Sequence, residues 1–158
     1  LLESYWGDDR SYHHTAPITA IYGLREALRL VAEEGIEERW TRHLRVAGGL
    51  KAGVEAMGLR LNPEDEFWLP SLNAVRIPEG VDAKALCRHI LTEYGIEIAG
   101  GLGDLADKII RIGCMGHSAR PRNVLNLLPA LADGFARQGV TLDAAAGLAA
   151  AAAALEVD

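Results

Sequence analysis

The sequence is poor in positive charge, in cysteine and in long apolar runs, and each shortage argues against a class of protein. Its formal net charge is −6 at pH 7, whereas nucleic-acid binding usually requires a basic surface. No apolar run approaches membrane-spanning length, and no signal peptide is visible. The two cysteines, Cys87 and Cys114, lack a CxxC spacing and are interpreted as small buried hydrophobic residues in a reducing compartment. The sequence therefore predicts a cytoplasmic protein that binds neither nucleic acid nor a membrane.

Length and composition are those of a globular protein. The 158 residues are 49% hydrophobic and 24% charged, which suffices to bury a sizeable core. Helical periodicity with glycine and proline boundaries predicts helices at about 17–34, 37–57, 82–94 and 119–138. Short alternating segments predict strands at about 59–61, 71–78, 96–99 and 109–113. This order favours an α+β fold, a small and mainly antiparallel sheet with helices packed on one face.

Apolar spacing also predicts which helix residues face the core. On the helix from about 37 to 57 we expect Trp40 and Leu44 to point inward, with Arg42 among charged neighbours on a solvated face. On the helix from 82 to 94 we expect Leu91 and Tyr94 to point inward.

The two ends of the chain differ from its middle. Residue 1 is leucine rather than methionine, so we expect the chain to be a piece of a longer polypeptide. Residues 17–139 are assigned to one small domain. Residues 140–158 are dominated by alanine, which favours helix but offers little bulk for packing. We therefore expect a loosely packed helix in this tail.

Arg111 is the most informative residue, because it lies inside the apolar strand Ile109-Ile110-Arg111-Ile112-Gly113. Side chains alternate between the two faces of a strand, so Arg111 faces away from Ile110 and Ile112. A planar guanidinium there must meet either water or an anion, and it suits a carboxylate that accepts two parallel hydrogen bonds. The local pattern alone favours the wet face, since antiparallel sheets commonly leave one face solvated.

Polar residues precede the first helix, in the run Tyr12-His13-His14-Thr15-Ala16-Pro17. Adjacent histidines lack the spacing that metal ligands on one helix face require, so we predict no metal site. Thr15 suits a helix N-cap, and hydroxyl groups at a helix start also suit a phosphate.

Two other segments invite a chemical interpretation. The run Gly100-Gly101-Leu102-Gly103 lacks the spacing of a phosphate-binding P-loop and is interpreted as a tight turn between strands. Cys114 and His117 are close in sequence, but no third group stands at a spacing that would orient them for nucleophilic catalysis.

Taken together, three segments resemble one family. They are Tyr12-His13-His14-Thr15 through Leu28, then Gly95 through Gly103, and then Arg111-Ile112-Gly113-Cys114-Met115-Gly116 with Arg122-Asn123-Val124. Their order and spacing resemble the C-terminal domain of class V pyridoxal-phosphate aminotransferases, above all the alanine–glyoxylate and serine–pyruvate enzymes. The resemblance covers about residues 5–135. It implies a small α+β domain, preceded in residues 1–16 by a remnant of a large cofactor-binding domain and a linker.

The resemblance also implies roles for individual residues. Arg111 matches the arginine that binds the α-carboxylate of the amino-acid substrate. Tyr12 and Thr15 match residues that reach the phosphate of pyridoxal 5'-phosphate, in that family across a homodimer interface. The implied reaction transfers an amino group from L-alanine or L-serine to glyoxylate or a related 2-oxo acid.

The sequence departs from the family at its catalytic lysine, which forms a Schiff base with the cofactor. The three lysines here, Lys51, Lys84 and Lys108, do not occupy the expected strand-end context. We therefore expect this lysine to lie upstream and the chain alone to be inactive. Open alternatives are another class V enzyme, of the phosphoserine aminotransferase or cysteine desulfurase type, and a non-catalytic binding or dimerisation module.

Overall fold

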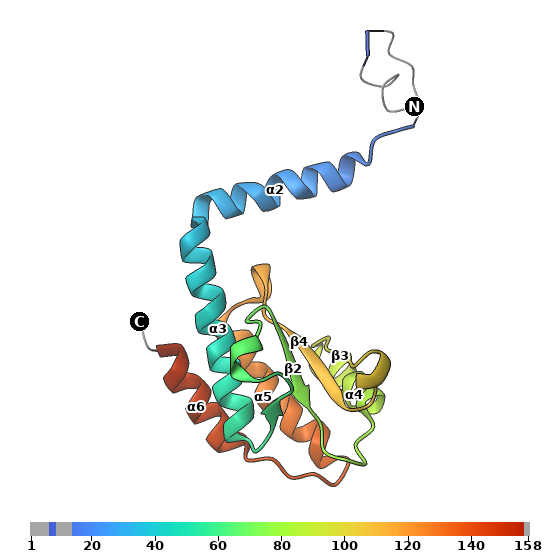
Figure 1. The fold of residues 1–158 in the computed structure, drawn as a ribbon, viewed down its shortest axis with the longest axis vertical. Helices are drawn as coiled ribbons and strands as arrows, with labels where there is room; N and C mark the ends of the chain where they lie inside the picture. Colours follow the sequence, from blue (N-terminus) through green and yellow to red (C-terminus); the bar gives the residue numbers. More distant parts are fainter. Residues whose placement is uncertain (1–6, 9–13, 157–158) are drawn as a thin grey trace. The chain divides into compact units, whose positions relative to one another are not determined.

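A computed structural model describes residues 7–8 and 14–156 of the chain. It separates into two compact units, Leu1–Arg39 and Trp40–Asp158, and each is described by itself. Figure 1 shows the fold, with helices and strands labelled where there is room. No helix among the described residues combines the length and the apolar character that crossing a membrane requires.

The first unit contains helix α2 (Ile18–Glu34), as its apolar periodicity predicted. Pro17 is its N-cap, and Gly35, with φ +86°, ends it. No residue of α2 is buried, and its apolar stripe, which includes Leu24 and Leu28, is exposed. Ion pairs within the helix, from Arg29 to two glutamates, add modest local support.

The second unit is built on a four-stranded antiparallel sheet in the order β1-β2-β4-β3. The strands are β1 (Arg60–Leu61), β2 (Leu72–Arg76), β3 (Ala99–Gly100) and β4 (Ile109–Gly113). The two edge strands are two residues long, and β1 places Arg60 directly opposite Arg76 of β2. The predicted α+β class is confirmed.

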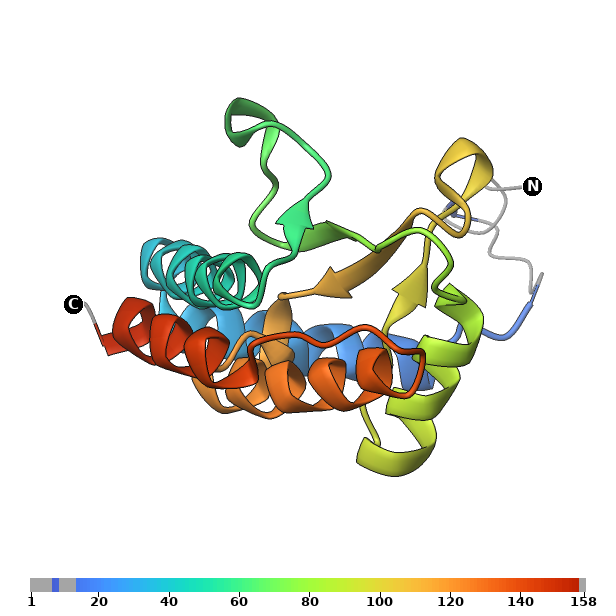
Figure 2. The same ribbon diagram turned by 90° about the horizontal axis from the view of Figure 1, so that it is seen from below.

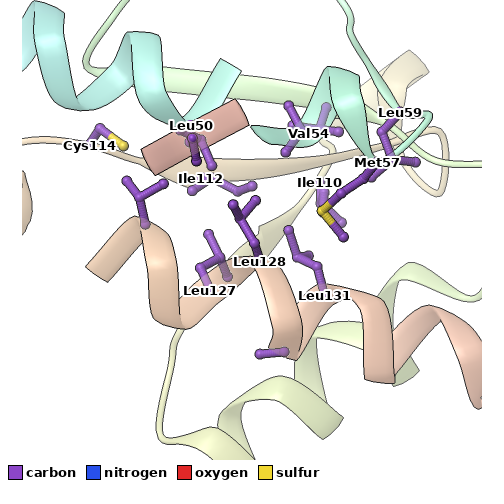
Figure 3. Close-up of a cluster of buried hydrophobic side chains, with 14 of the residues drawn as sticks. Leu50, Val54, Met57, Leu59, Ile110, Ile112, Cys114, Leu127, Leu128 and Leu131 are labelled. Atoms are coloured by element: carbon purple, nitrogen blue, oxygen red, sulfur yellow. The ribbon is translucent and has the colours of Figure 1, made fainter. Parts of the chain in front are cut away.

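Helices cover one face of this sheet (Figure 2). They are the part of α3 (Ile36–Ala56) that lies in the second unit, α4 (Ala83–Tyr94), α5 (Pro121–Ala136) and α6 (Ala144–Glu156). Ile110 and Ile112 of β4 are almost fully buried and lie between α3 and α5, as Figure 3 shows. The core therefore sits between β4 and these two helices, and it fixes the orientation of β4.

Four side chains predicted to face the core are exposed instead. Trp40 is 65% exposed and Leu44 is 55% exposed, because the buried face of α3 begins only at Val46. Leu91 is 47% exposed and Tyr94 is 43% exposed, at the end of α4. Helical spacing predicts which residues share a face, but it does not predict how far along the helix that face is covered.

Helix α6 is held more closely than its alanine-rich sequence suggested. Ala151 is fully buried, and Leu155 is 8% exposed. A Cβ on Gly49 of α3 would lie 2.6 Å from Leu155 Cγ, and one on Gly147 of α6 would lie 2.3 Å from Met57 Cγ. The helices approach closely because each glycine leaves room for a larger side chain from the other side, so the lack of bulk permits the packing.

This close packing predicts different effects for two glycine-to-alanine substitutions. Both Gly48→Ala and Gly147→Ala gain helix propensity, but a Cβ at Gly48 has no atom within 4 Å, whereas one at Gly147 meets Met57 and a backbone oxygen. We expect the unfolding free energy of Gly147→Ala to be at least about 1 kcal/mol below that of Gly48→Ala, from overpacking. Denaturant unfolding measures this difference, and equal midpoints would contradict the close packing of α6.

Candidate functional site

Arg111 lies on the sheet face that the helices leave open. It pairs with Ala74 of β2 on one side and with Ala99 of β3 on the other. Residues directly opposite each other in antiparallel strands share a face, so two alanines flank the arginine there. Neither alanine has the bulk to cover the guanidinium. Arg111 is half-buried and lies on an inner strand of the sheet. Its side chain is therefore accessible from the open face.

One hydrogen bond fixes the guanidinium. Arg111 Nε donates to the carbonyl oxygen of Gly100 at 2.8 Å. Within the described part of the chain, no carboxylate lies within ion-pair distance of Arg111, and its terminal amino groups have no hydrogen-bond acceptor. These two groups form the end of the guanidinium that matches a carboxylate in a two-hydrogen-bond geometry. The site can therefore bind a carboxylate-bearing molecule.

The glycine-rich run beside Arg111 is a turn between β3 and β4, as predicted. The backbone N–H of Gly101 donates to Ile109 O at 2.9 Å. A Cβ on Gly101 would lie 1.9 Å from Leu105 O, so only glycine fits there. This turn sets the position of the Gly100 carbonyl, the acceptor that holds Arg111.

Helix α3 anchors the connection between β4 and α5. Arg42 Nη1 donates to Ala119 O at 2.6 Å and to Gly116 O at 3.1 Å. His43 Nε2 accepts the backbone N–H of Gly116 at 2.8 Å, which requires that nitrogen to be unprotonated. The sequence interpretation of Arg42 as part of a solvated face is therefore wrong. No sequence signal links residues this far apart in the chain.

The pair Cys114 and His117 does not form a nucleophile with its base. Cys114 is 4% exposed, and burial raises the pKa of its thiol to about 11. The Nδ1 atom of His117 lies 2.9 Å from Arg120 Nη2, so the ring interacts with an arginine rather than with a thiol. Cys114 acts as a buried hydrophobic residue, as predicted. Cys87 is half-buried, and desolvation raises the pKa of its thiol.

The residues predicted to contact a cofactor belong to the first unit. Tyr12 lies outside the described residues. Thr15 is exposed two residues before Pro17, which is the N-cap of α2, so Thr15 is not the cap. His14 is exposed, and within residues 7–8 and 14–156 no three metal-ligating side chains come together. The phosphate-contact role of Tyr12 and Thr15 stays a prediction.

The lysines of the chain occupy three surface settings. Lys51 ion-pairs with Asp65, and this hydrogen bond is the main cause of the raised pKa of Lys51. Lys84 is exposed in the first turn of α4, and Lys108 is exposed in the turn before β4. A lysine that attacks a carbonyl needs a neutral amine, usually obtained by burial that lowers its pKa. Lys51 has the opposite shift.

By fold and by site, the second unit is a small α+β domain with a half-buried arginine on the open face of an inner strand, held by one backbone carbonyl. No protein-family model matches the chain. The (S)-ureidoglycine–glyoxylate transaminase of Bacillus subtilis (strain 168) is 45% identical to it over 150 residues, which is 95% of this chain and 36% of that protein. The alanine–glyoxylate aminotransferase of Callithrix jacchus is 41% identical over 127 residues, covering 78% of this chain and 31% of that protein.

Solved structures agree with these relatives. The crystal structure of ureidoglycine–glyoxylate aminotransferase from Bacillus subtilis superposes with a TM-score of 0.90 at 44% identity, over 99% of this chain and 40% of that one. The chain is homologous to the C-terminal domain of class V pyridoxal-phosphate aminotransferases. It spans about a third of the length of the curated relatives it matches.

The burial of Cys114 predicts that its thiol is unreactive in the folded chain. With Cys87→Ser removing the other thiol, we expect the native chain at pH 8 to react with a thiol reagent at least tenfold more slowly than the unfolded chain. A pKa of about 11 leaves roughly one thiol in a thousand ionised at that pH. Cys114→Ser, which retains the half-buried Cys87, is the control. Similar rates for folded and unfolded Cys87→Ser would contradict the burial.

Proposed function

We propose that the protein containing this chain is a pyridoxal-phosphate-dependent aminotransferase. It moves an amino group from L-alanine or L-serine to glyoxylate or a related 2-oxo acid. The observation that carries this proposal is the guanidinium of Arg111, a residue on the open face of the sheet whose Nε is held by Gly100 O and whose terminal amino groups have no acceptor among the described residues. Both the amino donor and the 2-oxo acceptor carry a carboxylate next to the reacting carbon, so a single arginine serves both halves of the reaction.

Arg111 would act by position. Its Nε is occupied by Gly100 O, so the guanidinium plane is set before a ligand arrives. A carboxylate held by the two terminal amino groups has its α-carbon at a fixed place and orientation. Orientation of this kind contributes roughly 7–11 kcal/mol in well-aligned intramolecular reactions, of which one contact supplies a part.

The described residues fit pyridoxal phosphate in part. Thr15 is an exposed residue, and we propose that it contacts the phosphate together with Tyr12. None of the three lysines has a buried amine, because Lys51 is ion-paired with Asp65 and both Lys84 and Lys108 are exposed. When bound, the cofactor withdraws electrons from the α-carbon of the amino acid. The proposal therefore assigns the reactive lysine to the part of the protein outside this chain and derives no cofactor step from residues 1–158.

The donor has a second candidate. Both relatives have glyoxylate in their names, but one pairs it with ureidoglycine and the other with alanine. The 45% identity with the first makes ureidoglycine the alternative donor. Initial rates with L-alanine, L-serine and (S)-ureidoglycine at one glyoxylate concentration separate these donors. We further propose a cytoplasmic homodimer in which Tyr12 and Thr15 reach the phosphate of the neighbouring subunit.

The carboxylate role predicts a specific kinetic defect. In the complete protein, Arg111→Ala should lower kcat/KM for the amino donor by about ten- to a hundredfold, because a hydrogen bond to a charged group contributes roughly 1.5–3 kcal/mol. Arg111→Lys should retain part of the activity, since lysine keeps the charge but loses the planar geometry. Cofactor absorbance should be unchanged in both variants. The matched control is Arg76→Ala, on the same sheet face but beside Arg60. An unchanged kcat/KM in Arg111→Ala would contradict the role.

The lysine settings predict that this chain alone forms no specific adduct with pyridoxal phosphate. After mixing and borohydride reduction, we expect no single lysine to be modified stoichiometrically, with Nα-acetyl-lysine as the positive control for the chemistry. Peptide mapping by mass spectrometry measures this. Complete and selective labelling of Lys51, Lys84 or Lys108 would contradict the assignment of the reactive lysine to another part of the protein.

A further inference from the structure

A hollow of ≈ 470 Å³ lies beside the end of the strand that carries Arg111. One wall is the segment Gly95–Ile98, which leads from α4 into β3, and the opposite wall is the end of β4 with Cys114. Its floor is formed by apolar residues of α3 and α5: Leu50, Val124 and Leu127. The hollow therefore lies between the segment that precedes β3 and the end of β4, the strand with which β3 pairs.

The backbone of Gly113 faces this hollow. In an antiparallel ladder, successive residues direct their N–H and C=O groups to alternate sides. Cys114 N–H bonds to Ser71 O on the β2 side, and Ile109 O accepts the N–H of Gly101 on the β3 side. Gly113, like Ile109, directs its backbone groups to the β3 side. There β3 begins only at Ala99, the partner of Arg111, so no described strand pairs with Gly113 on that side.

The segment before β3 has the sequence to complete this ladder. The pairing of Ala99 with Arg111 and of Gly100 with Ile110 fixes the register. Extending it by two residues pairs Ile98 with Ile112 and Glu97 with Gly113. Ile98 would then face the buried layer, and Glu97 would face the open side, diagonal to Arg111. Diagonal neighbours in a sheet lie within reach of long side chains.

We propose that residues 96–98 close onto β4 and bring the Glu97 carboxylate to the free end of the Arg111 guanidinium. Glu97 is then an internal carboxylate that occupies the anion site until a ligand carboxylate displaces it. This inference rests on the proposed function, because it assumes that Arg111 binds the carboxylate of the substrate. In the open arrangement Glu97 is exposed, and Ile96 and Ile98 are only half-buried, so closure also buries apolar surface.

Both ends of the moving segment are held. Gly95, with φ +65°, ends α4, and α4 is tied to α5 by the contact of His89 Nε2 with Asp133 Oδ2 at 2.6 Å. At the other end Ala99 is paired with Arg111. Between these points, one backbone hydrogen bond among the described residues holds the segment. It runs from Ile96 N–H to Ile90 O and is long, at 3.4 Å. Closure therefore requires a change only in residues 96–98, next to a glycine hinge.

The proposal is tested by acetate binding to the 158-residue chain, followed through the Arg111 Nε–H signal in ¹⁵N NMR spectra. Glu97→Gln should bind acetate at least about twofold more tightly than the unsubstituted chain, because the apparent dissociation constant is the intrinsic one divided by the open fraction. Glu93→Gln, an equal charge change on the exposed end of α4, should bind like the unsubstituted chain. Backbone amide shifts that acetate still causes in Arg111→Ala, which has neither the charge nor the Nε–H signal, identify acetate binding elsewhere on the chain.

The outcomes separate the two proposals. If acetate shifts the Arg111 signal with equal affinity in the unsubstituted chain and in Glu97→Gln, the internal carboxylate is overturned while the carboxylate role of Arg111 stands. If acetate leaves the Arg111 signal unchanged in Glu97→Gln, the carboxylate role itself fails. Amide hydrogen exchange provides a second measurement. Closure predicts that the Glu97 and Gly113 amides are protected and that acetate lowers this protection. Exchange of both amides at the rate of an unfolded chain would overturn closure.

Discussion

The hydrogen bond from Arg111 Nε to Gly100 O is the constraint on which the site depends. It turns a long, flexible side chain into a fixed charge on the central region of the sheet. Its acceptor is in place because Gly101 accommodates the Leu105 carbonyl and because β3 pairs with β4. The orientation of β4 depends in turn on Ile110 and Ile112, which are buried under α3 and α5. The position of one charge thus rests on the core of the second unit.

Much of this arrangement could be predicted from local sequence. The alternation in β4 predicted that Arg111 lies on the sheet face away from two buried isoleucines, and the glycines predicted the turn before it. The anchoring of the β4–α5 connection by Arg42 and His43 could not be predicted, because it joins α3 to a loop more than 70 residues later. Exposed Trp40 and Leu44 show the same limit, since the extent of coverage along a helix is a tertiary property.

The segment Ile96–Ala99 is the instructive disagreement. Its alternation predicts a strand, yet only Ala99 of these residues pairs with β4. Strand propensity indicates only that the side chains fit a pleated surface. A strand also requires a neighbouring strand close enough to form backbone hydrogen bonds. Here α4 ends at Gly95 and is fixed to α5 through His89 and Asp133, which sets where the segment starts. The side-chain alternation therefore favours a strand paired with β4, whereas the fixed end of α4 keeps residues 96–98 away from β4.

The shortness of β1 and β3 has a consequence for how copies of the chain meet. A long exposed edge strand offers a row of unpaired backbone groups to any other sheet, and natural proteins avoid such edges with short strands and charged residues. Both edges here are two residues long, and β1 carries Arg60, which faces Arg76 on its neighbour. Two copies that approached edge to edge at β1 would gain little pairing and would bring arginines together. The sheet can thus keep one face open to a ligand without offering a template for aggregation.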